Sequence, residues 1–397
     1  MSIITEVDVL PFEYEVDDVS VRIHRPSGVS GMVYAKGEKR RMTRYAVAIR
    51  TDDGHEGRYV TNWVGTASAL GQTVMLAPSL LGHNPEHREH IYDILKREAR
   101  AYDHMGHGAL DIALWDLVGR KYGASIATLL GAYRERLPAY ASTHHGQDSP
   151  GGLDSVEAYA EFAVACREQG LQGFKIHGWH DGDRRREAHV VGAVRRAVGA
   201  DMEIMVDPGC KLPTYADALY VGRACDDNLC FWYEDPYRDS GVSVVGSRML
   251  RENLRTPLLV SKHVRGPEQK AAFALAGGCD MINMDPEYDL GITGAMKIAH
   301  FAESIGMDVQ LHACGPAHRA CMAAIRNTHF YELALVGPDM PNPTPPVYGC
   351  GYTDQLAGVA GDGSVPVPSG PGLGVDYAWD YVEAHKVGEH RFRLNAQ

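Results

Sequence analysis

Acidic side chains stand at the ends of two neighbouring apolar segments of the sequence. Asp207 closes the run 203–207 (EIMVD), and Glu234 closes the run 231–234 (FWYE). Hard divalent cations such as Mg²⁺ are bound by carboxylate oxygens that converge from several strands. Either acid alone is more simply a loop acid or a helix cap. Together, at successive strand ends, they predict a Mg²⁺ site whose third oxygen ligand would come one strand later.

Basic and imidazole side chains at other segment ends could move protons. The segment 174–177 (FKIH) alternates apolar and polar residues, so a strand there would point Lys175 and His177 to the same side. His312 ends a later segment, and Asp285 ends the segment before it, where its carboxylate could orient and charge the imidazole. Histidine titrates near neutrality, and burial can bring lysine there. These residues are therefore candidate acids and bases, although a lone histidine is usually structural.

Parallel strands joined by helices would bring these segment ends together. The run 173–207 is a strand, a loop, an amphipathic helix and a second strand, which is a parallel βαβ unit. The repeated strand–helix rhythm indicates a closed barrel or a doubly wound sheet. Polar residues at nearly every strand end favour the barrel, because the carboxyl ends of barrel strands carry the chemistry. The predicted strands are 137–142, 173–177, 203–207, 231–234, 258–263, 281–285 and 308–312, and the predicted helices include 155–169, 188–198, 216–225, 266–276 and 293–306.

The chain is predicted to divide into three parts. Residues 1–131 begin with strand-like segments and continue with helical ones, as in an α+β domain. Residues 132–336 hold the strand–helix repeat. Residues 337–397 are rich in Pro and Gly and are predicted to run back along the N-terminal domain.

Two segments of the N-terminal part are candidate substrate-contacting loops. Residues 16–41 are rich in Gly, Arg, Lys and Ser and resemble a mobile flap more than a core element. Their basic side chains form either a solvated face or a lid that helps to hold an anion. Residues 59–65 (YVTNWVG) are the second candidate.

Composition limits the possible partners. The 397 residues carry 39 Lys and Arg against 51 Asp and Glu, a formal net charge of −12. So acidic a chain is not expected to bind nucleic acid or an anionic membrane surface, but local cations could still capture a small anion. No apolar run approaches a membrane span, and the eight Cys show no paired or metal-finger spacing. A cytoplasmic protein with free thiols is expected.

Seven short motifs occur in a fixed order along almost the whole chain: ALDIALWDLVG, LLGA, FKIH, IMVD, WYEDP, LGITG and PGLGV. In this order and spacing the sequence resembles the enolase superfamily, most closely its mandelate racemase-like branch of acid-sugar dehydratases and racemases. The resemblance implies an α/β fold: a modified (β/α)₇β TIM-type barrel under an N-terminal α+β capping domain. It also implies a homo-oligomer and a small-molecule carboxylate substrate, an acid sugar.

The resemblance also implies roles for individual residues. It places one Mg²⁺ on Asp207, Glu234 and a third acid on the next strand. The basic residues of the second strand fall on Lys175 and His177, and the base of the opposite face falls on His312, paired with Asp285. Glu332 falls where the family has an electrophilic acid beside the substrate carboxylate.

Two departures from the family pattern matter. The second-strand motif is often Lys-x-Lys, whereas this sequence has Lys175-x-His177, which weighs against racemisation more than against dehydration. The third metal acid falls on Lys262, in the run VSKHVRG, and a protonated lysine cannot ligate Mg²⁺. Either His263 or water substitutes for that acid, or the metal site is weakened. A neutral His263 would favour a softer divalent ion than Mg²⁺.

The expected activity is metal-dependent dehydration of a sugar acid. A base removes the α-proton of the carboxylate substrate, an enediolate forms, and His312 protonates the departing 3-hydroxyl to give a 2-keto-3-deoxy acid. One alternative is a racemase, epimerase or cycloisomerase that uses the same enediolate. Another is a barrel that binds an acid sugar without turning it over, because Lys262 has spoiled the metal site.

Overall fold

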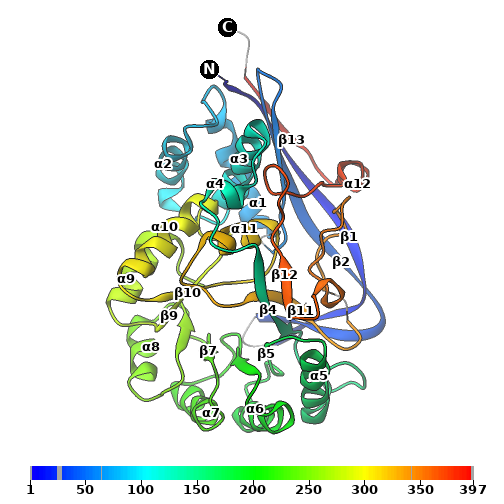
Figure 1. The fold of residues 1–397 in the computed structure, drawn as a ribbon, viewed down its shortest axis with the longest axis vertical. Coiled ribbons are helices and arrows are strands. Elements are labelled where there is room, and N and C mark those ends of the chain that lie inside the picture. Colours follow the sequence, from blue (N-terminus) through cyan, green and yellow to red (C-terminus); the bar gives the residue numbers. More distant parts are fainter. Residues whose placement is uncertain (1, 25–28, 64, 341, 395–397) are drawn as a thin grey trace.

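The computed structural model describes residues 2–24, 29–63, 65–340 and 342–394. It has an N-terminal α+β part, seen at the top of Figure 1, and a curled parallel sheet ringed by helices below it. The N-terminal sheet is four-stranded, in the order β13-β1-β2-β3. Its first strands are β1 (Ile4–His24), β2 (Val29–Thr51) and β3 (Glu56–Val60).

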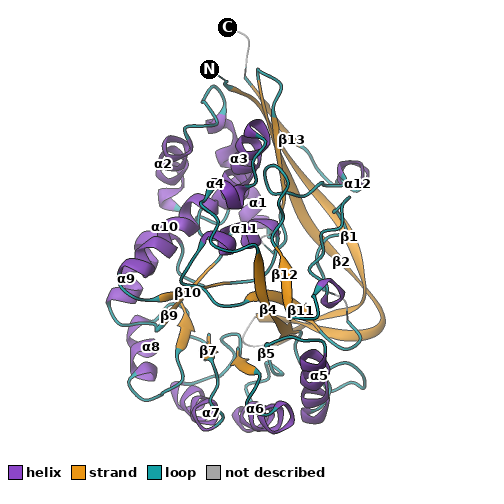
Figure 2. Cartoon of the chain, in the orientation of Figure 1, coloured by secondary structure: helices purple, strands orange, loops and turns teal. Residues whose placement is uncertain are grey.

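Strands β1 and β2 form one long antiparallel hairpin that runs beside the whole molecule (Figure 2). The pairing extends from Ile4↔Thr51 to His24↔Val29, with a register shift between Asp17 and Val19. The flap at 16–41 stays a prediction: its described residues, 16–24 and 29–41, are paired strands of the hairpin, and residues 25–28 lie outside the described part of the chain. From Lys36 to Arg41 both faces of the ribbon are exposed, so the sequence there lacks the alternation that marks a half-buried strand.

The helices of the N-terminal part are α1 (Ala67–Leu76), α2 (Arg88–Glu98), α3 (His107–Tyr122) and α4 (Ile126–Leu129), with short 3₁₀ turns at Ala77–Leu80 and Ala99–Ala101. Helices α1 and α3 pack against the N-terminal sheet, and the other helices of this part pack against α3. Helix α3 is buried from His107 to Gly119. Small residues make this burial possible, because strand β3 lies so close that a Cβ at Gly57 would meet the Ala113 carbonyl at 2.3 Å. The helix ends at Gly123, whose φ of 63° suits a left-handed cap.

The second part of the described chain alternates strictly between parallel strands and helices. The sheet order is β10-β9-β8-β7-β6-β5-β4-β11, which is the order of a (β/α)₇β barrel. The predicted TIM-type barrel beneath an α+β domain is thus confirmed. The strands are β4 (Arg136–Thr143), β5 (Gly173–Ile176), β6 (Glu203–Val206), β7 (Trp232–Glu234), β8 (Leu258–Val260), β9 (Met281–Met284), β10 (Asp308–Leu311) and β11 (Tyr331–Val336).

The barrel helices cover the outside of the sheet (Figure 1). Four of them begin after a Ser, Thr or Asp whose side-chain oxygen accepts a hydrogen bond from the first turn, which is why they start there. The helices are α5 (Val156–Glu168), α6 (Arg184–Val198), α7 (Tyr215–Asp227), α8 (Val244–Arg251), α9 (Gly266–Leu275), α10 (Gly291–Ser304) and α11 (Pro316–Ala324).

The interior of the barrel holds a separate apolar cluster below the strand ends: Tyr140, Met205, Trp232, Leu259 and Met281. Above it the lining becomes polar, and the ammonium of Lys175 lies 5.6 Å from the centre of the Tyr140 ring. The apolar layer fills the barrel, so polar chemistry is confined to one end of it.

The C-terminal segment returns to the N-terminal sheet. It contributes a 3₁₀ turn (Leu356–Gly358), β12 (Ser364–Pro366), α12 (Trp379–Ala384) and β13 (His390–Arg393). Strand β12 pairs with β4 of the barrel, and β13 pairs with β1, from Val9↔His390 to Glu6↔Arg393. Among the described residues, no helix combines the length and apolar character needed to span a bilayer.

Candidate active site

The carboxyl ends of the barrel strands gather the polar residues that the sequence singled out. Each stands in a strand or directly after one: Lys175 in β5, His177 after β5, Asp207 after β6, Glu234 at the end of β7, Lys262 and His263 after β8, Asp285 after β9, His312 after β10, and Glu332 in β11. Because neighbouring parallel strands end at the same edge, side chains far apart in sequence meet there.

Lys175 lies at the centre of an ion-pair network. Its Nζ is 2.9 Å from Oε2 of Glu234, 2.9 Å from Oε1 of Glu332 and 3.6 Å from Oδ2 of Asp207. Only 1% of the side chain is exposed. Burial alone would lower the pKa of Lys175, but the surrounding carboxylates outweigh it and hold the pKa far above its usual range. Lys175 is therefore a permanent cation that solvent does not reach.

Lys262 forms a second centre beside the first. Its Nζ lies 2.9 Å from Oδ2 of Asp235, 3.5 Å from Oε1 of Glu234 and 3.9 Å from Oδ2 of Asp207. Burial would lower its pKa, but the same carboxylates raise it well above the usual value. Burial would raise the pKa of Asp207, and Lys262 and His177 hold it well below its ordinary value. Two ammonium groups thus share the acids at the ends of β6 and β7.

His177 reaches the same acids from the side. Its Nδ1 lies 2.5 Å from the carbonyl oxygen of Thr143, which can only accept, so Nδ1 carries the hydrogen. Its Nε2 lies 3.2 Å from Oδ2 of Asp207. With 11% of its side chain exposed, His177 is more accessible than Lys175. The backbone contact fixes which ring nitrogen is left for proton transfer.

Asp285 and His312 form a dyad. The Nδ1 of His312 lies 2.7 Å from Oδ2 of Asp285, while Nε2 of His318 lies 3.1 Å from the other carboxylate oxygen. Tyr288 stacks on the His312 ring at 5.6 Å between centres. Burial would raise the pKa of Asp285, but the histidines hold it below its usual range. A charged carboxylate therefore orients His312 through Nδ1 and leaves Nε2 as the atom that can exchange a proton.

Glu332 is a charged partner of Lys175. Its second carboxylate oxygen accepts the backbone N–H of Ala313 at 2.5 Å. Burial would raise its pKa, but the Lys175 ammonium and His312 lower it to about 2. At neutral pH the group is a carboxylate and cannot donate a proton.

Strained backbone accompanies these side chains. Non-glycine residues with positive φ follow three of the strands: Asp235 (36°), Ser261 (85°) and Ala313 (64°). Such conformations cost of order 1–3 kcal/mol each and persist where the surroundings fix them, as at functional sites. Here they turn the chain directly after β7, β8 and β10.

The N-terminal part covers this end of the barrel. The buried carboxylate of Glu287, just after β9, accepts hydrogen bonds from the Tyr59 hydroxyl at 2.6 Å and from the backbone N–H groups of Asn62 and Trp63 at 2.7 and 2.8 Å. The hairpin adds a contact where Nδ1 of His145 lies 3.0 Å from the Met32 carbonyl. Both candidate loops of the N-terminal part, 16–41 and 59–65, therefore contact residues next to the strand ends.

Several site residues were not singled out from the sequence. Asp235 directly follows Glu234 in WYEDP and is fully buried. The rings of His145 and His180 lie 3.8 Å apart between centres and are tilted by 59°, and both nitrogens of the buried His180 have no hydrogen-bond partner. Lys211 is also buried with an unpartnered Nζ, and burial lowers its pKa to about 8. The His144–His145 pair at the end of a predicted strand was a usable signal, but nothing local marks His180 or Lys211.

Possible metal ligands form two groups that share Asp235. Ligand atoms of Asp207, Glu234 and Asp235 lie within 4.8 Å of one another. His263, expected from the sequence as a third ligand, belongs to the other group, with Cys210 and Asp235. Its Nε2 lies 3.4 Å from Oδ2 of Asp235, and 42% of its side chain is exposed.

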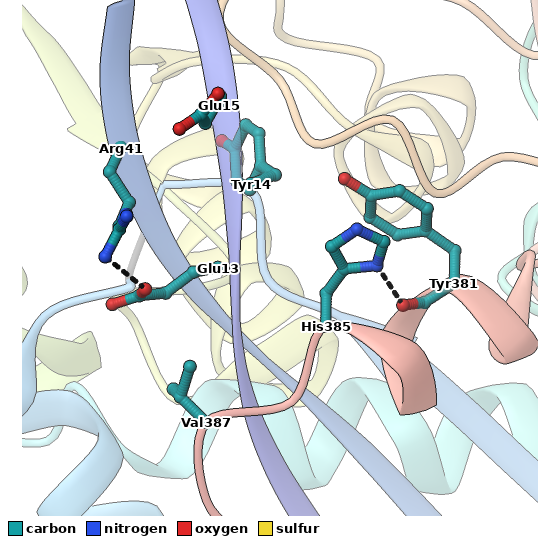
Figure 3. A pocket seen from close by; sticks show the side chains of 7 residues that line it. All are labelled: Glu13, Tyr14, Glu15, Arg41, Tyr381, His385 and Val387. Carbon is teal, nitrogen blue, oxygen red and sulfur yellow. Dashed lines mark hydrogen bonds and ion pairs between the residues drawn. The ribbon is translucent and has the colours of Figure 1, made fainter.

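A separate hollow lies on the N-terminal sheet. Figure 3 shows Arg41 paired with Glu13 and the His385 ring turned back to the Tyr381 carbonyl. No residue of the barrel strand ends lines it, and its lining has two acids and one arginine. Its lining residues are Glu13, Tyr14, Glu15, Arg41, Tyr381, His385 and Val387.

Comparison with known families matches both parts of the chain. The family described as "Mandelate racemase / muconate lactonizing enzyme, N-terminal domain" matches residues 18–131. The family described as "Enolase C-terminal domain-like" matches residues 158–381. The two matches follow the division between the capping part and the barrel.

Individual relatives carry different activities. The chain is 27% identical to a D-galactarolactone cycloisomerase of Agrobacterium fabrum over 87% of its length and 92% of the relative. It is 26% identical to a D-gluconate dehydratase of Thermoproteus tenax over 87% of its length and 70% of that protein. The crystal structure of a D-glucarate dehydratase from Agrobacterium tumefaciens, complexed with magnesium, superposes with a TM-score of 0.84 at 27% identity, covering 97% of this chain and 99% of the other.

Proposed function

The chain belongs to the mandelate racemase branch of the enolase superfamily, and on that premise we propose that it dehydrates a sugar acid. The observation that carries the proposal is the pairing of Asp285 with His312 across the barrel mouth from His177. Strands β6 to β9 separate β5 from β10 in the sheet, so the two imidazoles approach a bound substrate from different sides. One can take a proton while the other gives one.

The surroundings of β5 favour His177 over Lys175 as the base. A base must be deprotonated and must reach the substrate. Lys175 is locked among three carboxylates and almost fully buried, whereas the more exposed His177 has a single polar contact at Nε2, with Oδ2 of Asp207 at 3.2 Å. Lys175 instead positions the acids and supplies positive charge beneath the substrate carboxylate.

The proposed reaction loses water from adjacent carbons. His177 takes the α-proton from C2, and the electron pair enters the carboxylate as an enediolate. As the C2=C3 bond forms, the C3–O bond breaks, and Nε2 of His312 protonates the departing hydroxyl to give water. The enol then takes a proton at C3 while its C2 hydroxyl loses one, and it becomes a 2-keto-3-deoxy acid. Removing a proton handler of this kind costs typically about 10²–10⁴-fold in rate.

Magnesium, found in the related dehydratase structure, does not fit the donor set of this chain. Oxygens of Asp207, Glu234 and Asp235 lie within 4.8 Å of one another, but the expected His263 is not in that group, and the Lys262 ammonium lies among these acids. A hard divalent ion needs several free oxygen ligands, and a lysine supplies none. We therefore derive no step through a metal.

Glu332 also differs from its expected role. An electrophilic acid must hold a proton to donate to the substrate carboxylate, but Glu332 is ionised and paired with Lys175. In this proposal it orients Lys175 and offsets its charge.

Proton NMR in D₂O on a set of acid sugars, with and without Mg²⁺, tests the proposal. New methylene signals, partly deuterated, would support dehydration and identify the substrate. Loss of the α-proton signal without new methylene would favour racemisation or epimerisation instead. Unchanged spectra with every acid sugar would contradict the proposal. They would favour a protein that binds its ligand without converting it.

Cycloisomerisation is the second candidate, because one relative, aligned over 87% of this chain, is a D-galactarolactone cycloisomerase. It would use the same α-proton chemistry on a sugar-acid lactone. Consumption of a lactone in the same NMR experiment, without hydrolysis in a control lacking protein, would distinguish it from dehydration of the open-chain acid.

A further inference from the structure

The Lys262 ammonium occupies the place among the acids where a cation would be expected. Its Nζ lies within 4.0 Å of carboxylate oxygens from three residues on two strands: Asp207, Glu234 and Asp235. Those carboxylates are at most 2% exposed, and the Lys262 side chain is 13% exposed. Buried carboxylates require a positive partner, and here the chain provides it.

The inner carboxylate oxygens already have partners. Oε2 of Glu234 binds Lys175 at 2.9 Å, and Oε1 accepts the Asn283 amide at 2.8 Å and faces Lys262. Oδ1 of Asp207 accepts the Gly209 N–H at 2.8 Å, and Oδ2 faces His177. A divalent ion would have to expel the Lys262 ammonium and then lie next to a second ammonium, that of Lys175.

The backbone holds Lys262 at this position. Ser261, directly before it, has a φ of 85°, and its side chain is fully buried. The Arg265 guanidinium donates to the Lys262 carbonyl at 2.7 Å, and Val264 N donates to the Ser261 carbonyl. The turn after β8 is thus fixed on both sides of Lys262, and its side chain starts from the strand end, as a ligand on that strand would.

We propose that the Lys262 ammonium is a built-in cation that replaces the divalent metal of related enzymes. It offsets part of the negative charge of Asp207, Glu234 and Asp235 in the resting protein, and the native chain holds no divalent ion there. Its role toward substrate rests on the proposed function: with Lys175 it attracts the substrate carboxylate and the enediolate charge. A lysine offers one charge and hydrogen bonds, where a metal would offer two charges and a fixed coordination geometry.

Metal binding measured without substrate tests the inference. The native protein is stripped with chelator and titrated with Mn²⁺, followed by EPR of the free ion, and with Mg²⁺ by calorimetry. We expect no binding that depends on Asp207. One Mn²⁺ or Mg²⁺ per chain in the native protein, lost in Asp207→Asn, would overturn the inference.

Lys262→Glu provides the converse measurement. The variant restores a carboxylate at the strand end, so we expect it to gain one Mn²⁺ site, tighter than any in the native protein by on the order of 100-fold, since ligand charge sets such affinities. Asp207→Asn in the same chain should abolish the gained site. A folded Lys262→Glu chain that binds no more Mn²⁺ than the native protein would count against a cation position at Lys262.

Lys262→Met is a second test variant in case the Lys262→Glu chain does not fold. It keeps the length of the side chain and removes the charge, and circular dichroism with thermal melting reports its fold. We expect its melting temperature to rise with Mg²⁺ while that of the native protein stays unchanged, and a native melting curve that responds like the variant's would contradict the inference. These readouts need no turnover, so failure of the dehydratase proposal in the NMR experiment leaves them unaffected.

Discussion

Lys175 and His177 stand two residues apart on β5, yet their contacts give them different chemistry. The lysine is surrounded by three carboxylates, while the histidine donates one ring proton to a backbone carbonyl and has its other nitrogen 3.2 Å from Asp207 alone. The sequence alone left the choice between them open, because it placed both on one face. Tertiary contacts from residues of β6, β7 and β11 distinguish the lysine from the histidine.

His312→Asn should separate the two proton transfers. If His177 is the base and His312 the acid, dehydration should fall by about 10²–10⁴-fold, while exchange of the α-proton with D₂O continues. Proton NMR measures both. His329→Asn is the matched control, because His329 pairs with Asp308 at the opposite end of β10 and should leave both rates unchanged. Equal loss of exchange and dehydration in His312→Asn would assign it to the first step.

Glu187 should make stability depend on pH. This carboxyl is 2% exposed and accepts the Trp179 N–H at 2.9 Å in the loop after β5, and burial raises its pKa to about 8. Between about pH 4.5 and 8 the folded chain keeps a proton that the unfolded chain releases, so folding stability from this group falls as pH rises, by at most about 1.4 kcal/mol per pH unit.

Glu187→Gln removes that proton equilibrium while keeping an oxygen acceptor. We expect the variant to gain stability relative to the native protein as pH increases from 5 to 8, measured by thermal melting at each pH. Glu161→Gln, an exposed change on α5, should give a curve parallel to the native one. Parallel curves for Glu187→Gln as well would show that Glu187 is ionised throughout.

At the scale of elements, the strands and helices with clear periodicity were predictable and the short or exposed ones were not. Predicted strands at 203–207 and 281–285 match β6 and β9 because their apolar runs are buried on both faces. No bounds were predicted for helices α8 and α11, since eight and nine residues are too few to show a 3.6-residue pattern clearly. The pairing of β1 with β2 beyond residue 16 was missed because residues 36–41 are exposed on both faces and show no alternation.

The candidate site, like the fold, was partly predictable from local sequence. Strand-end positions could be predicted from local sequence, so Lys175, Asp207 and Glu234 were identified. The contacts between these side chains could not be predicted, because they depend on the backbone turn after each strand. The contact of Lys262 with Asp235 requires the left-handed backbone at Asp235 and Ser261, and neither residue type signals it.

Glu287 joins two elements, and its loss should loosen the cover of the site. Glu287→Gln replaces a charged acceptor of three hydrogen bonds by a neutral amide, and bonds to charged groups contribute about 1.5–3 kcal/mol each. We expect roughly 1–3 kcal/mol of destabilisation in urea unfolding, with faster hydrogen exchange at Asn62 and Trp63. Glu303→Gln, which breaks only the exposed pair with Arg326, should change stability by less than about 0.5 kcal/mol. Equal effects of the two changes would argue that Glu287 does not dock the loop.

At the scale of the whole molecule, the chain closes on itself. The barrel is inserted between strands of one N-terminal sheet, because β13 returns to pair with β1. Arg393 also binds Asp8 at 2.7 Å and Glu6 at 3.2 Å. The covering part therefore depends on residues from both ends of the sequence.

Ending the chain after Gly388 removes β13 and should destabilise the covering sheet. Four paired residues are lost, and with about one hydrogen bond per residue at about 0.5–1.5 kcal/mol each we expect a loss of about 2–6 kcal/mol. Calorimetry should show the covering part melting before the barrel. A chain ending after Leu394 keeps the ladder and serves as the control, and identical melting of the two chains would contradict the expected role of β13.

The return of β13 also sets an order of events during synthesis. The ribosome makes the entire barrel after β2 and before residues 390–393, so the growing chain carries β1 with one edge of backbone N–H and C=O groups unpaired for most of that time. Such an edge recruits other strands and promotes aggregation. Soluble yield should therefore depend on how long translation of the barrel takes, and comparing yields from fast and slow codons across residues 137–336 would measure it.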